Sequence, residues 1–165
     1  MSTRCRLREL EAALLPALES LTLAPEQLDC DIDQLEVDYG GGGRTEQGIH
    51  FCNYKYTGVI YAERIAQRKL SRLLCLIHAW LTDYDDVRDK YKQGNPVSTV
   101  IVLDGAYIDV MIQIPFIDEV YLRALADDES DPNEFIWHGK RFVPEEWLPD
   151  YADGGDVAGA PITEG

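Results

Sequence analysis

The spacing of apolar residues predicts two helices. Between residues 6 and 21, leucines recur at intervals of three and four, which is the period of one helix face. Pro16 interrupts this segment, and because its ring clashes with the preceding turn we expect a kink or break there. A second helix is predicted at about residues 68–82, where a wide apolar stripe ends in Ala79-Trp80-Leu81.

Alternating polarity and aromatic residues predict strands around these helices. Residues 29–37 alternate with a phase slip at Gln34, which indicates a bulged or edge strand. Residues 51–62 are rich in aromatic side chains, as strands often are. Beyond Ile117 the sequence loses its regular period. Further along, a tight hairpin is predicted around His138-Gly139.

Asp104-Gly105 lies between two apolar runs and gives the strongest local prediction, a β-hairpin. A two-residue turn there would place Ile101 opposite Ile108 and Val97 opposite Ile112, all on one buried face. The second strand then continues through Ile114 and Phe116 beyond the end of its partner. Such an overhang can be used to pair with another chain.

Length and composition indicate one domain and exclude some functions. With 165 residues, we expect a single domain over residues 1–148, followed by a disordered acidic tail over residues 149–165. The net charge is −15, and residues 118–165 hold 13 of the 30 acidic but only 3 of the 15 basic residues. So acidic a chain should repel phosphate backbones, whereas it suits a basic protein partner or the wall of a DNA passage. No apolar run reaches the ~18 residues of a membrane span, and the charged N-terminus is unlike a signal peptide.

Candidate catalytic and metal-binding motifs fail on their spacing. Asp29-x-Asp31-x-Asp33 lacks the later glycine and glutamate of a calcium loop, and the glycine run lacks the lysine of a phosphate loop. The four cysteines and three histidines are scattered, so we expect reduced thiols, no metal site and no cofactor. Asp83, Asp85 and Asp86 leave a weak metal-dependent hydrolase hypothesis open. We expect that the protein is not an enzyme.

The order of these elements is similar to that of a known family. An aromatic strand with Tyr54 and Tyr56 leads into the Ala79-Trp80-Leu81 helix, then a hairpin strand from Asp109 to Ile114, a Trp137-x-Gly139 turn and Trp147. This arrangement, over residues 28–147, resembles the phage tail completion protein R family, the tail terminators of contractile-tailed phages. The resemblance implies an α+β fold with a mostly antiparallel sheet and helices packed on one face.

The resemblance also implies a function in virion assembly. A ring, usually of six subunits, would cap the tail tube and sheath and provide the surface for attachment of the head through the neck protein. DNA would only pass through the lumen, no membrane would be involved, and the protein would be assembled in the host cytoplasm and located in the virion tail. The alternative hypothesis, based on the charge, is an acidic DNA mimic or inhibitor that binds a basic partner.

If the tail terminator hypothesis is right, three segments are expected to supply contacts with neighbouring subunits and proteins. They are a mobile loop that begins at the glycine run, the loop after the second helix, and the overhanging strand. The candidate interface residues are Gly40, Gly41, Gly42, Gly43, Arg44, Asp85, Asp86, Ile114, Phe116, Asp118 and Glu119.

Overall fold

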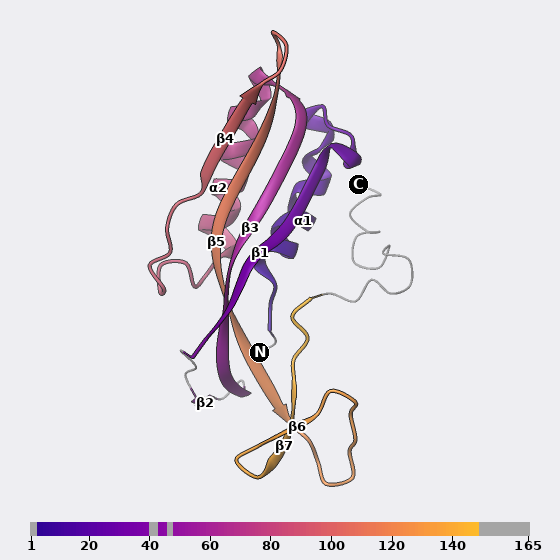
Figure 1. Cartoon of the computed structure of the whole chain (residues 1–165), viewed down its shortest axis with the longest axis vertical. Coiled ribbons are helices and arrows are strands. Elements are labelled where there is room, and N and C mark those ends of the chain that lie inside the picture. The colour runs from indigo at the N-terminus through magenta and orange to yellow at the C-terminus, as the bar shows by residue number, and fades with distance from the viewer. Residues whose placement is uncertain (1–2, 40–42, 46–47, 149–165) are drawn as a thin grey trace.

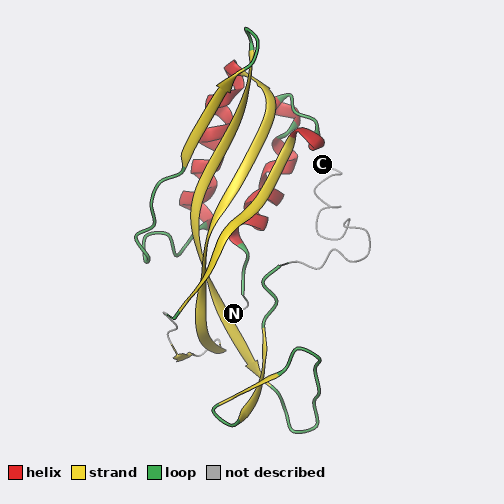
Figure 2. Cartoon of the chain, viewed as in Figure 1, coloured by secondary structure: helices red, strands yellow, loops and turns green. Residues whose placement is uncertain are grey.

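The protein folds as an antiparallel sheet with two helices on one of its faces. The computed structural model describes residues 3–39, 43–45 and 48–148. In Figure 1 and Figure 2 both helices lie behind the same face of the long strands, which confirms the predicted α+β class. The helices are α1 (Arg6–Leu14) and α2 (Leu70–Tyr84), and the strands are β1 (Leu28–Asp38), β2 (Gly43–Thr45), β3 (Gly48–Ala66), β4 (Val97–Val102), β5 (Tyr107–Ala124), β6 (Phe135–Trp137) and β7 (Lys140–Pro144).

Two long antiparallel strands, β3 and β5, form the centre of the sheet. Along the part backed by the helices, β1 pairs with the outer side of β3 and β4 with the outer side of β5. Beyond the helices β3 and β5 continue as a narrower extension, which carries β2 and the β6–β7 hairpin (Figure 1). The described chain therefore has a covered half and an extended half joined by the same two strands.

The main core lies between the helices and one face of the sheet. Along that face Ile60 lies opposite Ile112 and Tyr56 opposite Phe116, and all four side chains are buried. α1 covers this row with leucines at the predicted helical spacing, and α2 adds the stripe that ends in Trp80 and Leu81. The buried members from the two helices are Leu7, Leu10, Leu14, Leu73, Ile77, Trp80 and Leu81.

Several local predictions are confirmed. α1 ends at Leu14, and Pro16 lies in the short 3-10 helix Leu15–Ala17 that follows, so the break falls where the proline requires it. Gln34 has φ 54 and marks a register shift in β1, which is the predicted bulge. The β6–β7 hairpin turns at His138 and Gly139, both with positive φ.

One strand prediction and one side-chain prediction are wrong in detail. β5 does not end near Ile117 but continues to Ala124, because after Phe116 both of its faces are covered and the polarity no longer alternates. Cys75 lies within the apolar run of the second predicted helix, which indicates a buried small hydrophobe, but the structure shows it exposed on α2. The other three cysteines are buried free thiols.

The β4–β5 hairpin has a register one residue away from the predicted one. The Leu103 amide donates to the Tyr107 carbonyl (3.0 Å), so three residues rather than two form the turn. A two-residue turn of type I′ needs positive φ at both central positions, and here only Gly105 has it. As a result Val97 lies opposite Gln113, and both Val97 (62% exposed) and Ile101 (57% exposed) lie outside the core.

We predict that Gly58→Ala destabilises the fold. A Cβ at this position would lie 2.8 Å from Cε2 of Phe116 and 2.9 Å from Cδ1 of Leu7, so the core under α1 must shift. Overpacking of this kind costs about 1–3 kcal/mol of unfolding free energy. Urea denaturation of both variants measures it, with Gly94→Ala as the control, because there the nearest atom is 3.8 Å away. Equal stability of the two variants would contradict the described packing.

Candidate functional site

Five of the candidate interface residues contribute little or no surface. Ile114 and Phe116 are fully buried, because their side of β5 is paired with β3 and covered by the helices. Asp85, Asp118 and Glu119 are also buried. β5 does extend beyond the end of β4, as predicted, but the surface at this overhang must come from other residues than the buried Ile114, Phe116, Asp118 and Glu119.

The glycine-run segment is only partly described. Gly40, Gly41 and Gly42, where the expected mobile loop begins, lie outside the described residues. Gly43 and Arg44 belong to the short strand β2, where they pair with His50 and Ile49 of β3. Both are exposed. Arg44 therefore remains a candidate contact residue, on a strand of the extended half.

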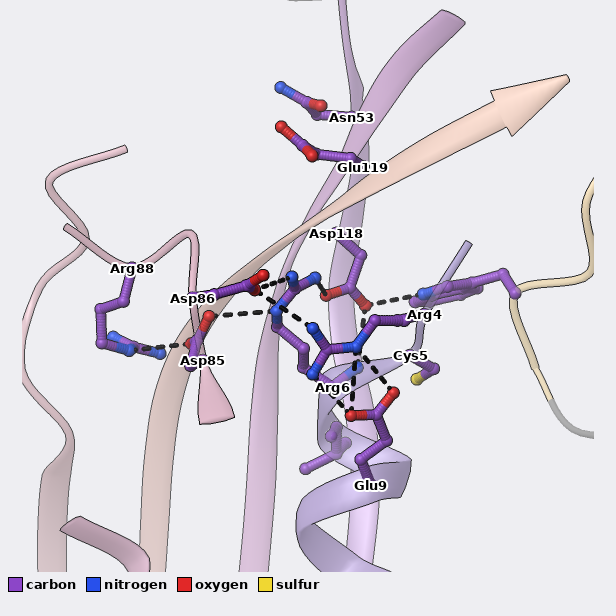
Figure 3. Close-up of polar contacts among 12 residues, drawn as sticks. Arg4, Cys5, Arg6, Glu9, Asn53, Asp85, Asp86, Arg88, Asp118 and Glu119 are labelled. Atoms are coloured by element: carbon purple, nitrogen blue, oxygen red, sulfur yellow. Dashed lines mark hydrogen bonds and ion pairs between the residues drawn. The ribbon is translucent and has the colours of Figure 1, made fainter. Parts of the chain in front are cut away.

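Three of the candidates, Asp85, Asp86 and Asp118, gather around a residue that sequence reasoning missed, Arg6. Its side chain is only 4% exposed, and its guanidinium contacts three carboxylates (Figure 3). Nη1 lies 3.2 Å from Oδ1 of Asp118, Nε lies 3.1 Å from Oδ1 of Asp85, and Nη2 donates to Oδ1 of Asp86. A planar guanidinium with several donors is well suited to bind carboxylates from different segments.

Asp118 is the acceptor on which most of these bonds converge. Its Oδ2 accepts hydrogen bonds from the Tyr56 hydroxyl and the Trp147 indole N–H, each at 2.7 Å, and from the Arg6 backbone amide at 3.3 Å. The Trp147 ring also packs edge-on against the Tyr54 and Tyr56 rings. One carboxylate thus joins α1, β3, β5 and the segment that follows β7.

Two further arginines surround the acidic residues of the loop after α2. Arg88 Nε lies 3.0 Å from Oδ2 of Asp85, and Arg4 Nη1 lies 3.1 Å from Oδ1 of Asp86. Acidic residues after a helix C-terminus oppose the helix dipole, and these arginines explain why they are tolerated here. The acidic residues Asp83, Asp85 and Asp86 directly after a predicted helix were the sequence signal that could have indicated arginine partners.

Burial and pairing act in opposite directions on the ionisation of this network. Burial raises the pKa of Asp118 and of Asp85, and the hydrogen bonds and positive charges around them only partly offset this. Burial also raises the pKa of Asp86, but the hydrogen bond to Arg6 and the charges of Arg6 and Arg4 together outweigh it, and the pKa is lowered. For Arg6, burial lowers the pKa, yet the Asp86 hydrogen bond and the Asp118 charge outweigh it and the pKa is raised. Arg6 is therefore charged at physiological pH.

Glu119, the last candidate, fixes the same loop to β5 at a second point. Its Oε2 accepts from the Lys90 ammonium at 2.7 Å and from the Tyr91 hydroxyl at 2.5 Å, and the Tyr121 hydroxyl donates to Oε1 at 3.1 Å. Burial raises the pKa of Glu119, but its hydrogen bonds to Lys90 and Tyr91 outweigh that and lower it. The loop from 85 to 96 is thus tied to the sheet, and Asp86 and Lys90 are its exposed charges in these contacts.

The network joins separate segments of the chain through ion pairs and hydrogen bonds. In the hydrolase hypothesis Asp83, Asp85 and Asp86 would hold a metal ion, but guanidinium groups already contact both oxygens of Asp85 and Oδ1 of Asp86. Among the described residues, no group of histidine, cysteine and acidic side chains has a metal-binding arrangement. Neither described helix is long and apolar enough to cross a membrane.

Comparison with known proteins identifies the family. A family model for the P2 phage tail completion protein R (GpR) matches residues 5–146, which is most of the chain. The chain belongs to the family of the P2 phage tail completion protein R. The match includes all of α1 and ends one residue before Trp147, so it covers nearly all residues of the Arg6 network.

One curated relative is a phage protein. An uncharacterized 19.2 kDa protein from the rep-hol intergenic region of Haemophilus phage HP1 (strain HP1c1) is 27% identical over 89 residues. The alignment covers 53% of this chain and 52% of that protein, so the chain spans about half the length of this curated relative. No solved structure matches the chain.

We predict that Arg6→Met strongly destabilises the protein. The long apolar side chain fills much of the same space, but Asp85 and Asp118 are left buried without their shared cation. Removal of one partner from a buried ion pair costs about 3–5 kcal/mol. Urea denaturation measures this against Arg123→Met, which removes an exposed pair with Glu129 and should cost at most about 1 kcal/mol. Similar losses in the two variants would show that the network is not a principal source of stability.

The stability deficit of Arg6→Met should also depend on pH. Arg6 lowers the pKa values of Asp85 and Asp118, so in the variant both pKa values rise further. A carboxyl group with a raised folded-state pKa favours folding most at low pH and loses that contribution as the pH increases through the raised value. The deficit relative to the unsubstituted protein should therefore grow from acidic to neutral pH, as measured by denaturation from pH 4 to 8. A deficit independent of pH would contradict the assigned ion pairs.

Proposed function

We propose that this chain is a tail terminator, a subunit of a ring that caps the tail tube and sheath of a contractile-tailed phage and presents the surface to which the head attaches. The family match over residues 5–146 carries this proposal. In this proposal the partners are further copies of the chain in a ring of six, the tail tube and sheath proteins, and the neck protein. The location is the head-proximal end of the virion tail.

The fold supports such a role by combining a rigid body with extended surfaces. The Arg6 network and the Glu119 contacts fix the loop after α2, so that its exposed residues are held in place before a partner arrives. The extension of β3 and β5 carries Arg44 and the β6–β7 hairpin away from the helix-backed core (Figure 1). Preorganised surfaces lose less conformational entropy when they bind.

The net charge of −15 suits a ring through which DNA passes. Acidic walls repel the phosphate backbone, so that DNA would slide without adhering. In the proposed ring DNA is therefore cargo and not a ligand.

A DNA mimic is the second candidate, and one feature of β1 favours it. Asp29, Asp31 and Asp33 are exposed on one face of the strand. Alternate residues of a strand are spaced at about 6.8 Å, so these carboxylates form a short regular row. The row has only three members before the bulge at Gln34, which makes it short for a mimic of a DNA strand.

Complementation of a phage that lacks this gene tests the two functions. For a tail terminator we expect free heads and unattached tails without the protein, rescue by the unsubstituted chain, and the chain at the head-proximal tail end in electron micrographs of labelled particles. An intact titre without the gene, with no copies in purified particles, would overturn the proposal. Rescue lost only in Asp29→Asn/Asp31→Asn/Asp33→Asn, with particles otherwise normal, would instead support the DNA mimic.

A further inference from the structure

The two free edges of the helix-backed sheet differ sharply. β1 is protected by the exposed acids Asp29, Asp31 and Asp33, by its bulge, and by the Arg8 side chain, whose Nη1 donates to the Cys30 carbonyl (2.9 Å). These are the features by which proteins prevent an edge strand from pairing with another chain. β4 at the opposite edge has none of them. Residues 97–103 carry no charge, and the pairing with β5 runs without a bulge.

The exposed side chains of β4 are mostly β-branched and apolar. All six residues of the strand are exposed, among them Val97, Val100, Ile101 and Val102. In a chain where 27% of residues are charged, such a stretch on an open edge is unusual. A long, flat and apolar edge strand pairs readily with another strand.

The backbone of β4 defines which groups are available for pairing. The Leu103 amide points to β5, where it donates to the Tyr107 carbonyl. Because successive residues of an antiparallel strand point their peptide groups to opposite sides, the amides and carbonyls of Ser98, Val100 and Val102 point to the free edge. Three residues in regular alternation can form a ladder of hydrogen bonds with a second strand.

We propose that two copies of this chain associate through antiparallel pairing of their β4 strands, about a two-fold axis at Val100. In this register Val100 lies opposite Val100 of the partner subunit, and Ser98 lies opposite Val102 of the partner subunit. All three outward-pointing residues of each strand are then hydrogen-bonded. The sheet continues through both copies, and their helices lie on the same side.

Charge favours a second copy at this edge over other contacts between copies. Each chain carries a net charge of −15, so two copies repel each other over most of their surfaces. The uncharged β4 edges can approach without adjacent like charges, whereas pairing of β1 strands would oppose rows of aspartates. A contact of the same patch on both subunits is also the commonest form of association in homo-oligomers.

This dimer does not rest on the proposed tail function. It uses a surface that the candidate interface residues do not include, and it would form in the free protein. Failure of the complementation experiment would leave it standing, and its own failure would leave the tail terminator proposal unchanged.

A cysteine at the proposed two-fold axis tests the pairing directly. Facing residues in a hydrogen-bonded antiparallel pair are about 5.5 Å apart between Cα atoms, which is within the range of a disulfide. In a Cys75→Ser background, which removes the exposed thiol, Val100→Cys should form a disulfide-linked dimer upon mild oxidation. Ile136→Cys in the same background is the control, because Ile136 is more exposed (74%) but lies on β6. Equal cross-linking at both positions would overturn the proposal.

A charge at the same position should abolish association. Val100→Lys places two ammonium groups side by side at the axis, and we expect the dimer Kd to increase at least tenfold in sedimentation velocity over a concentration series. Ile136→Lys should leave the dimer unchanged, and thermal unfolding of both variants verifies that they are folded. An unsubstituted chain that remains monomeric, or that forms larger assemblies without the Val100→Cys cross-link, would overturn the proposal; the latter would indicate a head-to-tail contact.

Discussion

The burial of one positive charge determines much of how this chain is arranged. A guanidinium removed from water must be paired, because an isolated buried charge costs far more than a domain of this size can offset. Arg6 at the start of α1 meets this requirement by collecting Asp85 and Asp86 from the loop after α2 and Asp118 from β5. The first helix, the loop and the central strand are thereby held in one relative position. Trp147 joins them through the same carboxylate.

The extended half of the sheet has a separate and smaller core. Ile49, Leu122 and Phe142 are buried there, and the rings of Phe51, Phe135 and Trp137 pack around them. Neither described helix backs this part (Figure 2), so its stability depends on β3 and β5 continuing from the main core. An extension of this kind can present side chains at a distance from the body of a subunit, as the proposed ring requires for contacts with more than one neighbour.

The two edges of the helix-backed sheet, β1 and β4, differ in charge in a way that matters for assembly. An acidic protein keeps its copies apart unless a neutral surface is provided. Within the described residues β4 is such a surface, while β1 combines charge, a bulge and the Arg8 contact at the other edge. Control over where copies meet prevents unspecific aggregation of a protein that must assemble in a defined way.

The sequence alone determined the elements whose signals are local. The leucine spacing of α1, the break at Pro16, the bulge at Gln34 and the His138-Gly139 turn each depend on neighbouring residues, and the resemblance in element order led to the correct family. Only the tertiary structure decided the hairpin register. The sequence Asp104-Gly105 is compatible with a turn that has positive φ at both residues and with one that has it at Gly105 alone, as here. It also decided the fate of the candidate site. From the sequence, Ile114 and Asp118 were expected at the surface. In the fold Ile114 is part of the main core, and Asp118 is buried and paired with Arg6, which is 112 residues away in the sequence. Long-range pairing of charges leaves no periodic signal in the sequence, so it could not have been predicted from it.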